Sequence, residues 1–195
     1  LVRLAAGRWR SILTGVLLAT VAVSAYAVAS KVLPEALDAT DATYAYARIQ
    51  VPFYYWNAVG LTAALGIAPC LWLGTRREGH GVLGGLAAPA LCVLLVALML
   101  SYSRRAVLAA AIGVAFWFAV VPLRLRALAL LATAGLPAAA VVAWAFRQPS
   151  LSHDHVALAA RSAAGHRLGL LLLAALAVTL VAALAVRFAA DRTPL

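Results

Sequence analysis

The sequence predicts an all-α, polytopic membrane protein with about six transmembrane helices, and two observations lead to that fold class. Hydrophobic residues make up 66% of the 195 residues and charged residues only 11%, whereas soluble domains are close to half apolar and a quarter charged. The charged residues also divide the chain into long uncharged runs, and a helix needs about 20 apolar residues to cross the bilayer. Composition therefore excludes a soluble globular enzyme and an intrinsically disordered chain.

Each uncharged run contains one predicted span. The first run follows a basic start, and its uncharged stretch is too long for the apolar core of a signal peptide. Backbone groups in lipid must be satisfied within the segment, and these runs do not alternate as barrel strands do, so each span is expected to be a helix. We expect one transmembrane helical domain over residues 1–195, forming part of a larger membrane domain. Its predicted spans are 11–30, 57–75, 82–103, 106–123, 127–146 and 168–186.

The charge distribution predicts the orientation. Lysine and arginine number 16 against 6 acidic residues, and they lie between apolar runs rather than on one soluble face, so membrane lipids are the expected partner and nucleic acid is not. With six spans, nine basic residues fall on the side of the termini and seven on the other. The positive-inside rule then places both termini in the cytoplasm.

Two predicted outer connections are longer than a turn. They run from Lys31 to about Trp56 and from Arg147 to Arg167, whereas the inner connections at 75–81 and 123–126 are short. Binding and catalytic residues are concentrated on long connections. We therefore expect any chemistry on the outer face.

The connection between the third and fourth spans, Ser103, Arg104 and Arg105, is the strongest candidate for chemistry. The topology places it outside, where positive charge is disfavoured, and the short fourth span keeps both arginines near the bilayer. Arginines at such positions are often functional, and guanidinium groups bind phosphate oxygens in pairs. These residues are expected to bind a lipid pyrophosphate. The alternative is ordinary contact with lipid headgroups.

A second candidate lies just before the second span. Arg48 is expected immediately outside the membrane, and Pro52 prevents the helix from starting early. Asn57 then presents an amide at the head of the span, and Gly60 allows close helix packing. A helix cap or an interhelical hydrogen bond is the alternative role for Asn57.

The histidines give weaker indications. His166 is a candidate proton carrier at the membrane surface, and otherwise an ordinary loop residue. His153 and His155 flank Asp154, which is a weak metal-site pattern, and the spacing of His166, the only other candidate ligand in this connection, matches no zinc pattern. No metal and no cofactor are therefore expected.

One segment resembles the O-antigen ligase and O-antigen polymerase superfamily of bacterial membrane glycosyltransferases. Members carry an Arg–x–x–x–Pro–Phe stretch that is followed by Asn and a helix of small residues. Arg48, Pro52, Phe53 and Asn57 match that pattern.

A second segment is similar to the Ser–Arg–Gly hairpin of the same superfamily. Ser103 and Arg104 match it, while Arg105 stands in place of the glycine. The resemblance extends over about residues 45–185. Family members have more spans and a large periplasmic loop with an essential histidine, and none of the histidines here maps onto it. The resemblance therefore implies a fragment that lacks this loop, and whether the chain alone is an enzyme stays open.

The resemblance implies a membrane glycosyltransferase of polysaccharide or lipopolysaccharide synthesis in the cell envelope. The donor would be a polyprenyl-pyrophosphate-linked glycan, and the acceptor a hydroxyl of a glycolipid or glycan, on the outer face of the bacterial cytoplasmic membrane. Arg104 would be the catalytic residue, binding the pyrophosphate and stabilising the leaving group. The substrate-binding candidates are Arg48, Asn57, Ser103, Arg105 and His166.

Two alternatives remain open at the level of sequence. A polymerase of the same superfamily would join glycan repeats, and the membrane core does not distinguish it from a ligase. A transporter or a non-catalytic membrane subunit belongs to a different class. The predicted spans contain no carboxylate, which argues against ion-coupled transport.

Overall fold

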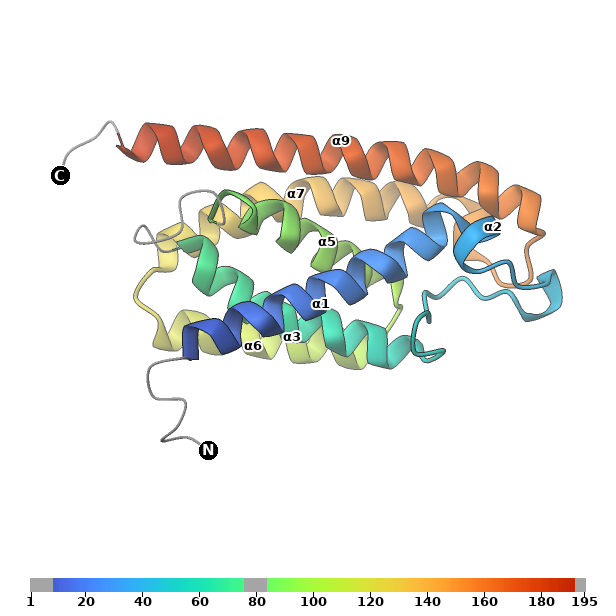
Figure 1. The fold of residues 1–195 in the computed structure, drawn as a ribbon, viewed down its shortest axis with the longest axis horizontal. Helices are drawn as coiled ribbons and strands as arrows, with labels where there is room; N and C mark the ends of the chain where they lie inside the picture. The colour runs from blue at the N-terminus through green and yellow to red at the C-terminus, as the bar shows by residue number, and fades with distance from the viewer. Residues whose placement is uncertain (1–8, 76–83, 192–195) are drawn as a thin grey trace.

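The computed structural model describes residues 9–75 and 84–191, with side chains described up to residue 186, and this part of the chain is helical without strands. Six helices of 14 residues or more lie roughly alongside one another (Figure 1). They are α1 (Trp9–Val32), α3 (Trp56–Thr75), α5 (Ala87–Leu100), α6 (Arg104–Val120), α7 (Arg124–Phe146) and α9 (Leu158–Asp191). Three single-turn helices join them: α2 (Pro34–Leu37), the 3-10 helix η1 (Ala42–Tyr44) and α8 (Pro149–Ser152). The predicted fold class is confirmed.

The long helices differ in their capacity to cross a membrane. Among the described residues, α1, α3, α7 and α9 are long and apolar enough to do so. Helices α5 and α6 have only 14 and 17 residues, about 21 and 26 Å at 1.5 Å per residue, against roughly 30 Å of hydrocarbon. Helix α5 is mostly buried and packs against α1, α3, α7 and α9. Neighbouring helices therefore surround it, and it need not match the thickness of the lipid.

Helix α9 starts earlier than predicted. The span was expected at 168–186, with residues up to Arg167 in an outer connection, but the helix begins at Leu158. Charged residues ended the uncharged run there, yet alanine and arginine are strong helix formers. Arg161 and His166 consequently lie on the helix, and the predicted loop is wrong over its second half.

Small residues allow the closest helix contacts. A Cβ at Gly165 of α9 would lie 2.5 Å from the carbonyl oxygen of Lys31 and 2.8 Å from that of Val32. Gly169, four residues later, also faces Val32. This small-xxx-small spacing is typical of close helix contacts in membranes, and here it brings α9 onto the C-terminal end of α1.

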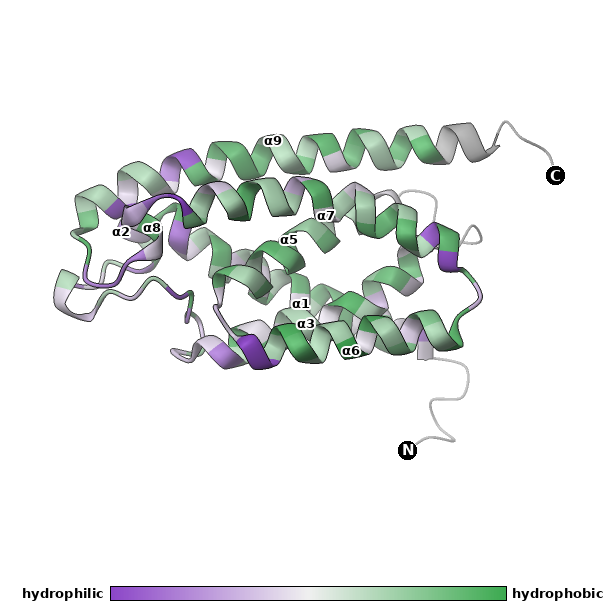
Figure 2. Ribbon diagram, turned by 180° about the vertical axis from the view of Figure 1, so that it is seen from behind, coloured by the Kyte–Doolittle hydropathy of each residue, from purple (hydrophilic) through white to green (hydrophobic). Residues whose placement is uncertain are grey.

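The two ends of the bundle differ. Helix α1 begins and α9 ends at one end, together with the connection between α6 and α7 (Figure 1). At the other end lie α2, η1, α8 and the connection from α5 to α6. Hydrophilic residues concentrate toward the ends, and the bodies of the helices are predominantly hydrophobic (Figure 2). We call the end with α2 and α8 the polar end, and it holds the connections that the sequence predicted to be outside.

The flanks of the bundle expose large apolar side chains. They are most frequent on α6 and α9, and only 11% of the most apolar window of α9 is buried. Exposed apolar area on this scale indicates a face toward lipid or another membrane helix. The protein is therefore a polytopic membrane protein. The exposed apolar residues of these two helices include Leu108, Ile112, Phe116, Leu170, Leu173, Val178 and Val181.

Candidate functional site

The polar end is organised by an extended segment, residues 38–55, which we call the connecting segment. Its backbone is bound by residues from distant parts of the chain. The Ala47 N–H donates to Oδ1 of Asp154 at 2.7 Å, and the His155 N–H donates to the Ala45 carbonyl at 2.7 Å. Asp154 and His155 therefore have structural roles. No group of three or more His, Cys, Asp or Glu side chains able to hold a metal ion occurs in the described residues.

Two cations also bind the connecting segment. The Lys31 ammonium, at the end of α1, donates to the Ala47 carbonyl, and Nη2 of Arg161, on α9, donates to the Thr40 carbonyl. Both side chains are half-buried. These bonds fix the segment over the ends of two helices that are far apart in sequence.

Asn57 and Ser103, from the two segments of the family resemblance, meet in the structure. The Ser103 hydroxyl donates to Oδ1 of Asn57 at 2.7 Å and accepts the Ala106 N–H at 3.2 Å, which makes it the N-cap of α6. Asn57 Nδ2 donates to the Tyr55 hydroxyl at 2.9 Å. Gly60 permits the approach, since a Cβ there would lie 3.0 Å from that of Ser103. The predicted close packing at Gly60 is therefore confirmed.

Arg104 and Arg105 are the first two residues of α6 rather than part of its preceding connection. Their side chains are exposed and form no hydrogen bond or ion pair with any described residue. Their backbone N–H groups, in the first turn, have no acceptor within the helix. A helix N-terminus already favours anions, so this corner combines two free guanidinium groups with a positive helix end.

Arg48 forms no hydrogen bond or ion pair with the residues of that corner. Its guanidinium carbon is 4.7 Å from the centroid of the Trp56 ring, a cation–π contact that holds it at the start of α3. Arg48 also lines a pocket with about 320 Å3 of space, open to solvent. The pocket residues are Ser30, Lys31, Pro34, Asp38, Tyr46, Arg48, Ile49, Ser150, Leu151 and Arg161.

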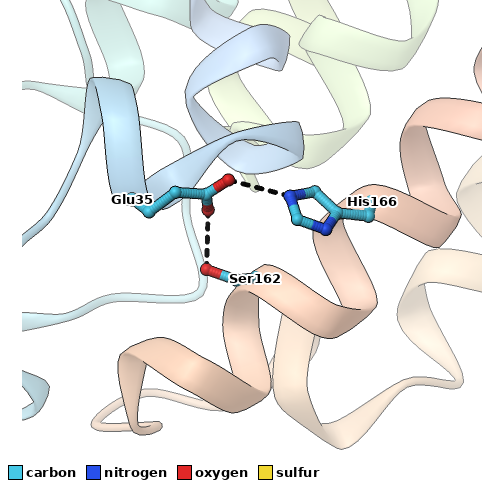
Figure 3. Close-up of polar contacts among 3 residues, drawn as sticks. All are labelled: Glu35, Ser162 and His166. Carbon is cyan, nitrogen blue, oxygen red and sulfur yellow. Dashed lines mark hydrogen bonds and ion pairs between the residues drawn. The ribbon is translucent and has the colours of Figure 1, made fainter.

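His166 is also separate, and it pairs with an acid (Figure 3). Its Nε2 lies 2.8 Å from Oε1 of Glu35, and the Ser162 hydroxyl donates to Oε2 at 2.6 Å. The bonds from Ser162, from the Glu35 backbone N–H and from His166 lower the pKa of Glu35 to about 2.

The structure thus brings together only some of the predicted residues. Asn57 and Ser103 are bonded, and Arg104 and Arg105 directly follow Ser103. Arg48 contacts Trp56, the residue before Asn57, and His166 pairs with Glu35 instead. Sequence reasoning missed Lys31 and Arg161 as site residues, because it counted them only toward the charge of the outer connections. The available signal was the pair Gly165 and Gly169, four residues apart, because this spacing indicates a close helix contact next to Arg161.

In comparisons with protein-family models, with curated proteins and with solved structures, the chain has no match.

Proposed function

We propose that the protein belongs to the machinery that transfers glycans from a polyprenyl-pyrophosphate donor to a hydroxyl of a glycolipid or glycan acceptor, at the outer face of the bacterial cytoplasmic membrane. In this proposal the corner at the start of α6 binds the donor pyrophosphate. The observation that carries it is the hydrogen bond between Asn57 and Ser103. It links the two segments that resemble the O-antigen ligase superfamily at the polar end of a membrane bundle.

The electrostatics of the corner support an anionic ligand. Two cationic side chains in the first turn oppose the helix dipole, because anions are the favoured charges at that end. Ser103 fixes the start of the helix, and Arg104 and Arg105 extend from it into solvent. The negative charge of a pyrophosphate would offset the unfavourable interaction of both arginines with the helix dipole, since guanidinium groups bind phosphate oxygens with paired hydrogen bonds.

The same arrangement suits departure of the pyrophosphate. When the sugar–phosphate bond breaks, negative charge grows on the bridging oxygen, and fixed cations nearby stabilise it. Arg104 is the proposed catalytic residue, and Arg105 adds a second charge. Asn57 and Ser103 act as positioning residues, because they orient the helix start that carries the arginines.

Retention of donor lipid by the purified protein tests the proposal. The chain in lipid nanodiscs is incubated with a polyprenyl pyrophosphate, and bound lipid is counted by native mass spectrometry. We expect the wild type to retain it and the double variant Arg104→Ala, Arg105→Ala to lose about tenfold or more of that affinity, because charge-assisted bonds contribute about 1.5–3 kcal/mol each. Arg124→Ala is the matched control, since Arg124 is an exposed arginine in the first turn of α7, at the other end of the bundle.

Transfer in cells separates the two family activities. In the cells in which the protein naturally occurs, replacing it with the Arg104→Ala variant should abolish glycan transfer without affecting membrane insertion. Transfer of one intact glycan identifies a ligase, and a ladder of increasing chain lengths identifies a polymerase. Normal transfer by Arg104→Ala, or equal loss of lipid retention in Arg124→Ala, would contradict the proposal.

A further inference from the structure

The pocket at the polar end is built from five separate parts of the chain. Lys31 comes from the end of α1, Asp38 and Arg48 from the connecting segment, and Arg161 from α9. Pro34 of α2 and Leu151 of α8 contribute apolar wall. About 320 Å3 of empty space, which includes open solvent at the mouth, lies between these residues.

The cations in this pocket have donors to spare. Lys31 uses one ammonium hydrogen on the Ala47 carbonyl, and an ammonium has three. Arg161 uses Nη2 on the Thr40 carbonyl, while its Nε is shielded from solvent and has no hydrogen-bond partner in the described chain. The Arg48 guanidinium makes the ring contact with Trp56 and no hydrogen bond to a described residue. A buried donor without an acceptor is unfavourable, so the pocket lacks an acceptor.

The nearby acids do not supply that acceptor. Within the described residues the only ion pair is that of His166 with Glu35, so neither Asp38 nor Asp154 comes within 4 Å of a pocket cation. Asp38 accepts the Thr40 hydroxyl through Oδ1, and Asp154 accepts the Ala47 N–H. With Lys31, Arg48 and Arg161 against Asp38, the lining carries two positive charges in excess, and Asp154, outside the lining, acts on Lys31 from beyond ion-pair distance.

We infer that this pocket binds a phosphate group. A phosphomonoester carries about two negative charges near neutral pH and three acceptor oxygens, which matches the excess charge and the three cationic side chains. A carboxylate would neutralise only one of those charges. The phosphate belongs either to the headgroup of a phosphomonoester lipid or to a soluble phosphate, because the pocket opens to solvent at the polar end of the bundle.

The pocket is formed before a ligand arrives. The bonds from Asp154 and Lys31 hold Ala47, next to Arg48, and the Ile49 N–H donates to the Leu100 carbonyl at 3.1 Å on its other side. Binding then requires little ordering of the chain, which lowers its entropic cost. The pocket contains none of the residues of the α6 corner, so this inference stands independently of the proposed donor site.

Two measurements on the intact protein test the inference and separate the two sources. Inorganic phosphate is titrated by calorimetry into the protein in phosphatidylcholine nanodiscs. Retention of phosphatidic acid over phosphatidylcholine is measured by native mass spectrometry. Phosphate binding supports a soluble ligand, retention of phosphatidic acid alone supports a lipid headgroup, and the failure of both overturns the inference.

Variants locate the binding. Arg48→Gln removes a pocket charge without removing any hydrogen bond within the described chain, and Arg161→Gln removes the buried Nε. We expect each to weaken binding about tenfold or more. Arg167→Gln removes an exposed charge from the same helix, outside the pocket, and should bind as the wild type does. Equal weakening in all three variants would show a nonspecific charge effect and overturn the inference, and thermal melting identifies any variant that fails to fold.

Discussion

At Gly165 the side chain is a single hydrogen because the carbonyl oxygens of Lys31 and Val32 occupy the space that a Cβ would need. Backbone atoms cannot rotate away as a side chain can, so any larger residue must separate α9 from the end of α1. Lys31 and Arg161 lie on these two helices and both line the pocket. The glycine therefore sets the geometry of a site that it does not touch.

Gly165→Ala should consequently destabilise the protein by about 1–3 kcal/mol, the usual cost of overpacking. Gly113→Ala is the matched control, because nothing lies within 4 Å of a Cβ at that helical position. It should leave stability unchanged or raise it by up to about 1 kcal/mol, the difference in helix propensity. Melting temperatures in detergent measure both effects. Equal melting temperatures for the two variants would contradict the close contact.

The environment of Glu35 predicts a pH dependence. Its pKa is lowered from 4.5 to about 2, so its contribution to stability is complete above about pH 4.5 and is lost as the pH falls through about 2. Ser162 is the largest cause, so Ser162→Ala should raise the pKa of Glu35 more than His166→Gln does. Carboxyl 13C shifts report this directly in protein labelled on glutamate, since the sequence contains only Glu35 and Glu78. A larger effect of His166→Gln would contradict this ranking.

At the scale of elements, the start of α6 depends on one hydroxyl. Ser103 caps the helix and also donates to Asn57 of α3. One side chain thus couples a helix end to a helix–helix contact. The Ser103 hydroxyl is buried with the rest of the residue. When it is removed, Oδ1 of Asn57 and the N–H of Ala106 each lose a hydrogen bond that water cannot easily replace.

Ser103→Ala should lower stability by about 1–2 kcal/mol, within the range measured for lost N-caps. Ser103→Thr retains the hydroxyl and should recover most of that loss. In a double-mutant cycle with Asn57→Ala, the two substitutions should be non-additive, because they remove the same bond. Additive effects would show that the bond does not contribute. Chemical unfolding in detergent gives all four stabilities.

Sequence and structure agree on elements where the bilayer imposes the pattern. Each predicted span overlaps one of the six helices, and four of these helices are long and apolar enough to cross a membrane. The start of α9 was mistaken because charge ended the run but did not end the helix. Arg104 and Arg105 were assigned to a connection for the same reason, although Ser103 before them is a recognisable N-cap.

At the scale of the whole molecule, the described helices place the connecting segment and α8 at one end and the α6–α7 connection at the other (Figure 1). The site at the polar end depends on this arrangement. Asn57 and Ser103 were singled out from the sequence as two separate candidates, and their contact was not predicted. The pocket could not be predicted either, because Lys31, Arg48 and Arg161 come together only through the packing of α1 and α9, which no local pattern specifies.

Labelling tests the arrangement in a membrane. Tyr44 is 67% exposed at the polar end, and Leu125 is 82% exposed at the other end. Cysteines at these positions, in a background with alanine at Cys70 and Cys92, should react with an impermeant maleimide from opposite sides of sealed vesicles. The positive-inside rule expects Tyr44→Cys to react from outside the cell and Leu125→Cys only after permeabilisation. Reaction of both from one side would contradict the arrangement.

The bonds of the connecting segment also have a consequence for biosynthesis. The segment is made early, but the carboxylate that binds Ala47 lies 107 residues later in the chain, and the guanidinium that binds Thr40 lies 121 residues later. While the ribosome is still making α7, these backbone groups can be satisfied only by water or by a chaperone. The connecting segment is therefore among the first parts of the chain to leave the translocon and among the last to reach its final form.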